Sequence, residues 1–243
     1  RMDAIEAFAA DVSHELKNPL TSLKSAVETL PLAKSEEARA RLTDIVMHDV
    51  RRLNRLITDI SDASRLDAEL SRQDAGPVDL ALLLKTVVEV QRGLSPDEGP
   101  EIDLVLVPPK TTVAQPWRVT GHDSRLGQVF TNLIDNARSF SPPGGKVTVT
   151  ARRDGNVIEV TVDDEGPGIR PETADRIFER FYTDRPEQEG FGNNSGLGLS
   201  ISKQIVEAHD GTIGAANRTS RDDNGETVVA GARFTVRLPA DES

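Results

Sequence analysis

The chain has 243 residues, with 29 basic and 40 acidic side chains and a formal net charge of −11. That charge argues against a general basic surface for nucleic acid, and the absence of cysteine excludes disulfide frameworks, thiolate zinc sites and cysteine nucleophiles. The longest aliphatic run, Leu80–Leu84, is far shorter than the ~20 residues that cross a bilayer. The chain begins at Arg1 inside a helical pattern, and we expect it to be a piece of a longer protein.

Two long amphipathic helices are predicted in the first part of the chain. Apolar residues recur at spacings of three and four from Ile5 to Leu30 and again from Leu42 to Ile60, which is the period of one helical face. Pro31 ends the first pattern, and the short connection after it predicts an antiparallel hairpin. Each apolar stripe has only one partner within a hairpin, so we expect two copies to form a four-helix bundle. The alternative is a helical arm that packs on the rest of the chain.

The helical pattern stops near residue 75, where Gly76 and Pro77 follow a polar stretch. We therefore predict a helical domain over residues 1–70, a linker over 71–79 and a second domain over 80–243.

The second domain mixes helices and strands. The strongest signal is a hairpin over 146–164, in which two alternating strands flank Asp154, Gly155 and Asn156. The predicted helices lie at 80–90, 125–140 and 197–208, and the other predicted strands at 102–107, 115–122, 212–217 and 232–239. Long antiparallel strands with three helices predict an α+β sandwich of one sheet layer and one helical layer.

His14 is the first residue that suggests chemistry. It lies two residues from its neighbours on the apolar stripe, a turn of about 200° that directs it to solvent. Asn18 shares its face, Glu15 is adjacent, and Pro19 leaves the Glu15 carbonyl without its helical donor. Such an imidazole suits a nucleophile that accepts and passes on a group, although an ordinary surface histidine fits equally well. The other histidines have no such company and are predicted to be structural: His48, His122 and His209.

Three further strings carry polar or glycine residues at suggestive spacing. Asn132 and Asn136 stand four residues apart on a predicted helix, so their amide oxygens could complete the shell of a phosphate-bound Mg²⁺; buried polar residues are the simpler alternative. Asp164 follows a predicted strand and can accept a hydrogen bond from an exocyclic amine such as that of adenine. Gly166 and Gly168 would leave room for a base, but a plain turn has the same pattern.

The fourth string is a glycine-rich loop that runs into a predicted helix. Exposed N–H groups at a helix N-terminus bind phosphate, and a flexible surface loop is the alternative. The glycines of this loop are Gly190, Gly192, Gly196 and Gly198.

Taken in order, these strings resemble the cytoplasmic core of bacterial two-component sensor histidine kinases over nearly the whole chain. The matching motifs are HELKNP at His14 (H-box), NLIDNA at Asn132 (N-box), DEGPGI at Asp164 (G1), IFERFY at Phe178 (F-box) and GLGLSI at Gly196 (G2). Within that family, the stretch around FYTDRP and NSGLGLSI is similar to alphaproteobacterial sensors of the ChvG/BvrS type.

The resemblance implies a HisKA-type dimerisation and phosphotransfer domain followed by a Bergerat-fold (GHKL) ATP-binding domain. It implies His14 as the phosphoacceptor, with Glu15 as its proton acceptor and Asn18 positioning a water for dephosphorylation. The cofactors would be ATP and Mg²⁺, with the metal at Asn132 and Asn136. The implied nucleotide-binding residues are Asn132, Asn136, Asp164, Gly166, Gly168, Tyr182, Gly196, Leu197 and Gly198.

The implied partners are a second copy of the chain and the receiver domain of a response regulator, with no nucleic acid. Contact with a membrane is expected only through a missing N-terminal region, which would anchor the full-length protein in the bacterial inner membrane and leave this part in the cytoplasm.

The sequence departs from the family where many relatives carry basic phosphate ligands, since it has Ser139 and Thr183 there. Arg180 or Arg185 could substitute. Two other functions stay open, a Bergerat-fold ATPase and a non-catalytic dimeric scaffold. The related hydrolases typically carry Glu where this chain has Asn132, an amide that cannot act as a base for water.

Overall fold

The computed structural model describes residues 2–72, 75–94, 99–109, 114–182, 196–221 and 224–241. The chain divides into two compact units, which are described separately. The first contains residues 1–67 and 179–198, and the second contains residues 68–178 and 199–243. Among the described residues, no helix is both long enough and apolar enough to cross a membrane.

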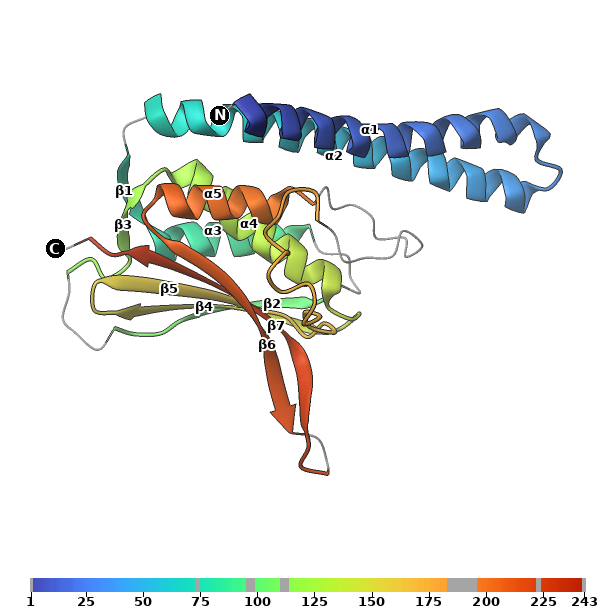
Figure 1. The fold of residues 1–243 in the computed structure, drawn as a ribbon. Coiled ribbons are helices and arrows are strands. Elements are labelled where there is room, and N and C mark those ends of the chain that lie inside the picture. Colours follow the sequence, from blue (N-terminus) through green and yellow to red (C-terminus); the bar gives the residue numbers. More distant parts are fainter. Residues whose placement is uncertain are drawn as a thin grey trace. The chain divides into compact units, whose positions relative to one another are not determined.

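The first unit is built on a helical hairpin (Figure 1). Helix α1 (Met2–Thr29) runs into a 3₁₀ turn, η1 (Leu30–Leu32), and α2 (Glu36–Arg72) returns beside it. Pro31 lies in that turn, as its fixed φ and missing donor predict. Ser35 caps α2 by accepting a hydrogen bond from the Ala38 N–H at 3.1 Å. The predicted hairpin is confirmed.

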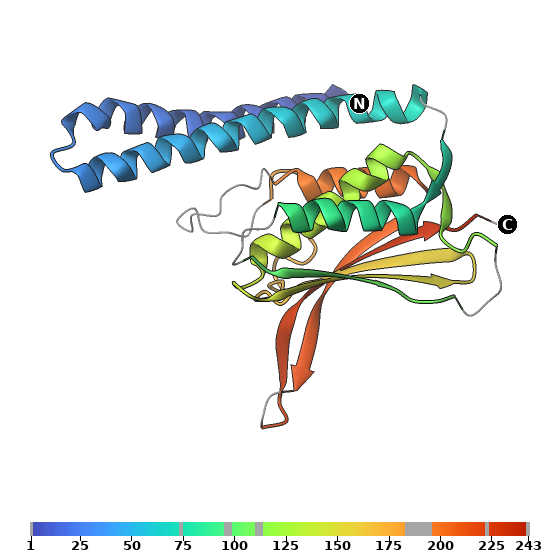
Figure 2. The same ribbon diagram turned by 180° about the vertical axis from the view of Figure 1, so that it is seen from behind.

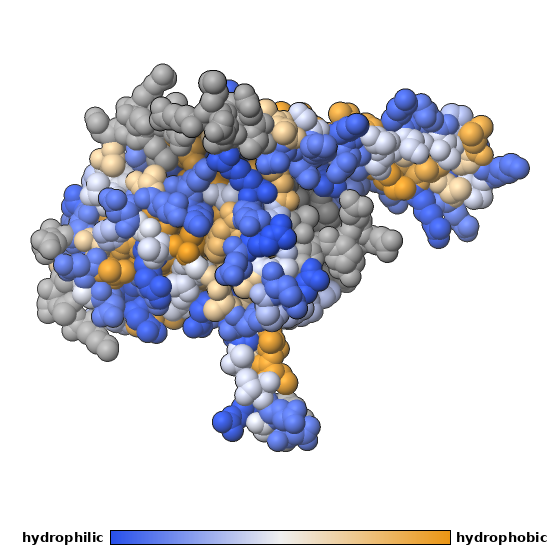
Figure 3. Space-filling view, in the orientation of Figure 1, coloured by the Kyte–Doolittle hydropathy of each residue, from blue (hydrophilic) through white to orange (hydrophobic). Residues whose placement is uncertain are grey.

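The two helices bury only part of their apolar surface against each other. Ala26, Leu56 and Leu66 are buried, whereas several members of the predicted stripes stay about half exposed: Leu20 (52%), Val27 (51%), Ile45 (42%) and Ile57 (55%). Figure 3 shows apolar surface along this hairpin.

The second unit is a five-stranded sheet with three helices on one face (Figures 1 and 2), which confirms the predicted sandwich. Its strand order is β2-β4-β5-β7-β6. The strands are β2 (Glu101–Leu106), β4 (Lys146–Asp154), β5 (Val157–Asp163), β6 (Thr212–Arg221) and β7 (Thr227–Pro239). The helices are α3 (Leu80–Gly93), α4 (Asp123–Phe140) and α5 (Gly198–Ala208).

The core lies between this sheet and its helices. Strands β4 and β5 pair antiparallel, with Val149 opposite Val162 and Ala151 opposite Val160, and all four side chains are buried. Helix α4 supplies a matching apolar face: Leu126, Val129, Phe130, Leu133, Ile134 and Ala137. The opposite face of α4 is thereby left for polar residues.

The sequence analysis missed two features of the strands. Strand β2 pairs parallel with β4, because the chain between them includes α4 and returns to the same end of the sheet. Residues 76–79, expected to lie in the linker, form strand β1 (Gly76–Asp79), which pairs with β3 (Arg118–Gly121) in a separate two-stranded sheet. Val78 and Val119 face each other in that sheet and are both buried.

Strands β6 and β7 are longer than their apolar patterns predict. Their far ends project beyond the rest of the sheet as a two-stranded arm (Figures 1 and 2), with a register shift between Arg218 and Thr219. Val228 and Val229 are exposed on this arm, where Figure 3 shows apolar surface.

Candidate functional site

Helix α1 carries the H-box residues on its solvent side. His14 and Asn18 are exposed and stand four residues apart, so they share a face. Glu15 is half-buried, and its carboxylate accepts a hydrogen bond from Arg52 of α2 at 3.3 Å. Pro19 lies inside α1 and is buried. The prediction that His14 faces solvent is confirmed, and the structure gives Glu15 a charged partner.

Two polar residues of α2 were missed by the sequence analysis. Arg52 reaches across the hairpin to Glu15, and Asp49, three residues earlier, is only 5% exposed. The Asp49 Oδ2 atom has no hydrogen-bond partner among the described residues. A signal was present in the sequence, because Asp49 stands three residues after Val46 and four before Leu53, on the apolar stripe itself.

Asp164 directly follows strand β5 and is buried, with 2% of its surface exposed. Its Oδ1 accepts hydrogen bonds from the N–H groups of Gly166 and Ala232, both at 2.9 Å. Its own backbone N–H donates to the Ala232 carbonyl at 3.0 Å. Burial raises the pKa of the Asp164 carboxyl, although these two N–H groups oppose the shift. One oxygen is thus held in a fixed orientation by backbone donors.

Two arginines of strands β6 and β7 bind Asp163 and the backbone of Asp164. Arg233 of β7 makes a bidentate pair with the neighbouring Asp163, at 2.7 and 2.6 Å. Arg218 of β6 donates to the Asp164 carbonyl at 2.7 Å. The sequence analysis did not find these residues, because they lie more than fifty positions from Asp164 and belong to no motif.

Gly166 and Gly168 lie where a side chain would not fit. A Cβ at Gly166 would stand 2.7 Å from the Phe140 carbonyl oxygen, and one at Gly168, where φ is +81°, would overlap a methyl of Val229. The Asn217 side chain holds the backbone of Ile169, the residue after Gly168. It accepts a hydrogen bond from the Ile169 N–H at 2.6 Å and donates one to the Ile169 carbonyl at 2.9 Å.

Asn132 and Asn136 lie one turn apart on the polar side of α4, and both are half-buried. The Asn132 amide donates to the Ser202 hydroxyl at 3.4 Å. Ser139, where many relatives carry a basic residue, donates its hydroxyl to the Asn136 carbonyl at 2.8 Å. Among the described residues there is no cluster of three carboxylate, histidine or cysteine ligands. The two amide oxygens fit a cation that keeps most of its shell from water and phosphate, as Mg²⁺ does.

The remaining candidates, Tyr182, Gly196, Leu197 and Gly198, belong with the first unit and are described apart from Asp164. The Phe181 N–H donates to the Gly196 carbonyl at 2.9 Å, and Gly196 has a φ of +72°. Leu197 is fully buried, and Gly198 begins α5. Thr183, Arg185, Gly190 and Gly192 lie outside the described residues.

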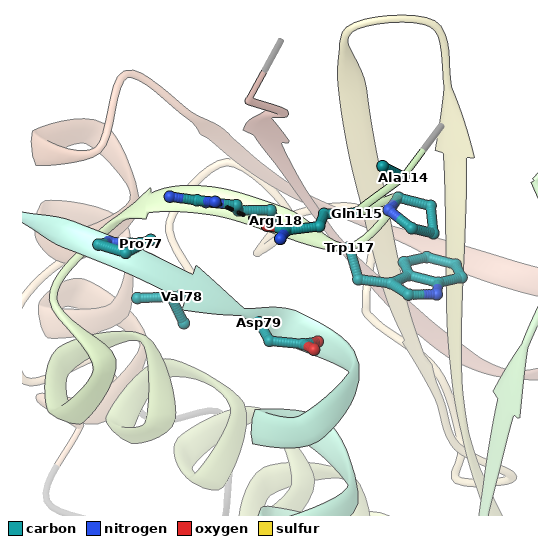
Figure 4. A pocket seen from close by; sticks show the side chains of 8 residues that line it. Pro77, Val78, Asp79, Ala114, Gln115, Trp117 and Arg118 are labelled. Carbon is teal, nitrogen blue, oxygen red and sulfur yellow. Dashed lines mark hydrogen bonds between the residues drawn. The ribbon is translucent and has the colours of Figure 1, made fainter. Parts of the chain in front are cut away.

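A pocket of about 370 Å³ lies beside the small sheet of β1 and β3, next to Trp117 (Figure 4). No candidate residue lines it. Its charged groups already serve the fold: Asp79 caps α3 through the N–H groups of Ala81 and Leu82, and Arg118 pairs with Asp241 at 3.3 Å. We assign this pocket no role in the site.

Comparison with known proteins identifies both parts of the chain. Residues 4–69 match the His Kinase A (phospho-acceptor) domain, and residues 121–242 match the histidine kinase-, DNA gyrase B-, and HSP90-like ATPase family. The chain belongs to the histidine kinase family. His14 lies within the first matched range, and Asn132, Asn136 and Asp164 lie within the second.

Among histidine kinases, the chain is similar to sensor protein ChvG of Agrobacterium fabrum, with 59% identity over the whole chain and 40% of the relative. It is 57% identical to ChvG of Rhizobium meliloti, over 99% of the chain and 41% of that relative. These likenesses confirm the predicted ChvG type. The chain spans about two-fifths of the length of these relatives.

A solved structure has the same kind of fold over nearly the whole chain. The crystal structure of full-length ShkA in complex with AMPPNP aligns with a TM-score of 0.63 and 26% identity, over 98% of this chain and 46% of that one. The GHKL fold predicted for the second domain is confirmed.

Proposed function

We propose that this chain is the catalytic core of a sensor kinase that transfers the γ-phosphoryl group of ATP to His14. The phosphoryl group then passes to an aspartate of a response-regulator receiver domain. The observation that carries the proposal is a division of roles: an exposed histidine on α1, in the range that matches a phospho-acceptor domain, and a buried carboxylate, Asp164, in the range that matches an ATPase.

Asp164 suits recognition of adenine. Backbone N–H groups hold its Oδ1, so the other oxygen can accept from the exocyclic amine of the base. Gly166 and Gly168 keep side chains away from the adjoining backbone. The structure of the relative ShkA is a complex with the ATP analogue AMPPNP, which supports ATP as the nucleotide.

Asn132 and Asn136 would hold Mg²⁺, which neutralises charge on the phosphates when bound. Their uncharged amides supply oxygen ligands without adding negative charge beside the triphosphate. Asn132 cannot act as a base for an attacking water, and this disfavours a simple ATPase. Asn18, one turn from His14, would orient a water for dephosphorylation of the regulator.

In the transfer step, a ring nitrogen of neutral His14 uses its lone pair to form a bond to the γ-phosphorus. The bond from that phosphorus to the bridging oxygen breaks, and the electron pair leaves with ADP. The proton on the other ring nitrogen passes to the Glu15 carboxylate. The exposure of the His14 ring leaves it open to the attacking geometry that this step needs.

Dimerisation is part of the proposal. The half-exposed apolar residues of α1 and α2, such as Leu20 and Ile57, would be covered by the same surface of a second copy in a four-helix bundle. We also propose that the full-length protein carries this core on the cytoplasmic side of the inner membrane, as expected for a ChvG-type sensor.

The experiment is transfer from ATP labelled on the γ-phosphorus. The proposal predicts label on the protein that survives alkali and is lost in acid, as a phosphoramidate linkage requires. Labelled free phosphate with no labelled protein would instead indicate an ATPase, and no turnover at all would indicate a scaffold.

A further inference from the structure

Arg52 contacts one carboxylate across the helical hairpin, and a second carboxylate stands one turn earlier on its own helix. Across the hairpin its guanidinium contacts Glu15 at 3.3 Å, and the two side chains are 23% and 25% exposed. On its own helix, Asp49 is three residues earlier and 5% exposed, and its Oδ2 has no hydrogen-bond partner in the part of the chain that the structure describes. The Arg52 guanidinium thus has two possible partners, Glu15 and Asp49, and is paired with Glu15.

The alternative pairing is within reach. Residues three apart on a helix are neighbours, and Asp–Arg pairs at this spacing form readily. An orphaned buried oxygen is unfavourable, so the arrangement with Arg52 on Glu15 carries a cost at Asp49. The reverse arrangement satisfies Asp49 and leaves the half-exposed Glu15 to water. Each arrangement satisfies one carboxylate and releases the other.

The position of Glu15 matters because it is adjacent to His14. Consecutive helical side chains diverge by about 100°, and Arg52 draws Glu15 toward α2, while His14 faces solvent. The observed pairing therefore holds Glu15 away from the ring that it would serve.

We propose that Arg52 is a positioning residue that exchanges between Glu15 and Asp49 and so controls when Glu15 can accept the His14 proton. With Arg52 on Glu15, the hairpin is in a low-kinase state. With Arg52 on Asp49, Glu15 is released to His14 and phosphorylation proceeds. This inference rests on the proposed function and adds a control to the same site.

The test is a double-mutant cycle in the whole chain, with Asp49→Asn, Arg52→Gln and the combination of both. Initial rates of acid-labile labelling give kcat and the KM for ATP. Asp49→Asn removes the charge that competes for Arg52, so kcat should fall several-fold with KM unchanged. Arg52→Gln should raise kcat several-fold. Adding Asp49→Asn to Arg52→Gln should then change nothing, because the exchanging cation is gone.

Three further variants control this cycle. Arg51→Gln and Asp44→Asn make the same chemical changes at exposed positions of α2 and should leave kcat unchanged. Arg52→Lys keeps the positive charge and should keep the sensitivity to Asp49→Asn. That sensitivity distinguishes an exchanging cation from a merely structural side chain.

An equal effect of Asp49→Asn with and without Arg52 would overturn the inference, and so would a fall in kcat on Arg52→Gln. If the wild-type protein carried no acid-labile label, the proposed function would fail and this inference with it. A labelled wild type with additive variants would refute this inference alone.

Discussion

The helical hairpin and the sheet domain differ in how completely they bury their apolar side chains. In the sheet domain, strands and helices close over a core in which Phe130, Val149 and Val160 are almost entirely buried. In the hairpin, Leu20, Val27 and Ile57 remain about half exposed although they belong to the apolar stripes. The sheet domain has a complete core of its own, whereas the hairpin leaves apolar surface exposed.

The polar residues differ in the same way. Asp164 of the sheet domain is buried and held by two backbone donors, which suits recognition of one ligand in one orientation. His14 and Asn18 of the hairpin are exposed, which suits a group that must meet two different partners in turn. Binding and transfer are therefore assigned to different parts of the chain, and substitutions should separate them.

The largest effect is expected at the buried carboxylate. In Asp164→Asn the amide NH₂ group would face the exocyclic amine of adenine, so two hydrogen-bond donors would meet. ADP affinity should therefore fall roughly 10–100-fold, the value of a hydrogen bond to a charged group. Isothermal titration calorimetry measures this directly. Glu165→Gln alters an exposed neighbour and should leave affinity unchanged; equal loss in both variants would remove Asp164 from the nucleotide site.

The second prediction concerns the half-exposed apolar residues of the hairpin. Ile57→Glu places a charge on apolar surface that the bundle would bury, so the dimer dissociation constant should rise at least about tenfold. Sedimentation equilibrium gives the constant. Leu82→Glu is the matched control, because Leu82 is 64% exposed on the sheet domain. An unchanged dissociation constant in Ile57→Glu would show that this surface does not form the dimer.

The third prediction separates two activities on one helical face. Asn18→Ala should keep most autophosphorylation and lose most dephosphorylation of the regulator. The reason is that Asn18 is proposed to orient the water that attacks the regulator's phosphoryl group and has no proposed contact with ATP. Helix stability should change by under about 1 kcal/mol, since alanine is the better helix former. The measurement is the decay of a regulator phosphorylated beforehand, and equal decay with wild type and variant would make Asn18 structural.

The smallest effect is a dependence of stability on pH in the sheet domain. His209 donates from Nδ1 to the Ile205 carbonyl at 2.7 Å and accepts at Nε2 from the His122 N–H at 3.0 Å. Burial lowers the pKa of His209 below 6.5, with His122 adding to the shift and Asp210 opposing it. Between the lowered pKa of folded His209 and 6.5, the unfolded chain therefore binds a proton at this histidine that the folded chain does not bind.

Stability from His209 should be fully present above pH 6.5 and decline as the pH falls toward the lowered folded pKa. Thermal unfolding between pH 8 and pH 5 measures this decline. His14→Gln should leave the slope unaltered, because His14 is exposed, whereas His209→Gln should flatten it. A slope that is unchanged by His209→Gln would assign the pH dependence to other groups.

The sequence predicted most of the fold because periodicity reports burial. The apolar face of α4 and the alternation of β4 and β5 were visible in the order of residues, and the turn at Gly155 marked their hairpin. Local pattern does not report which strands pair, so the parallel pairing of β2 with β4 was missed. Gly76 and Pro77 were interpreted as breakers, yet proline is tolerated in a short edge strand such as β1.

Residues of the candidate site that belong to a sequence motif could be predicted. Residues that reach the site only through long-range contacts could not. His14, Asn132 and Asp164 stand in recognisable strings. Arg52 meets Glu15 across 37 positions, and Arg233 meets Asp163 across 70. Such partners depend on register and packing, which single-sequence patterns do not encode.

The central claim is that the exposed histidine of the hairpin receives the phosphoryl group from nucleotide bound to the sheet domain. The most direct measurement is acid-labile labelling from γ-labelled ATP in His14→Gln, with AMPPNP affinity measured on the same preparation and His48→Gln as the control. The account predicts unchanged affinity, complete loss of label in His14→Gln and retained label in His48→Gln. Acid-labile label that persists on His14→Gln would contradict it.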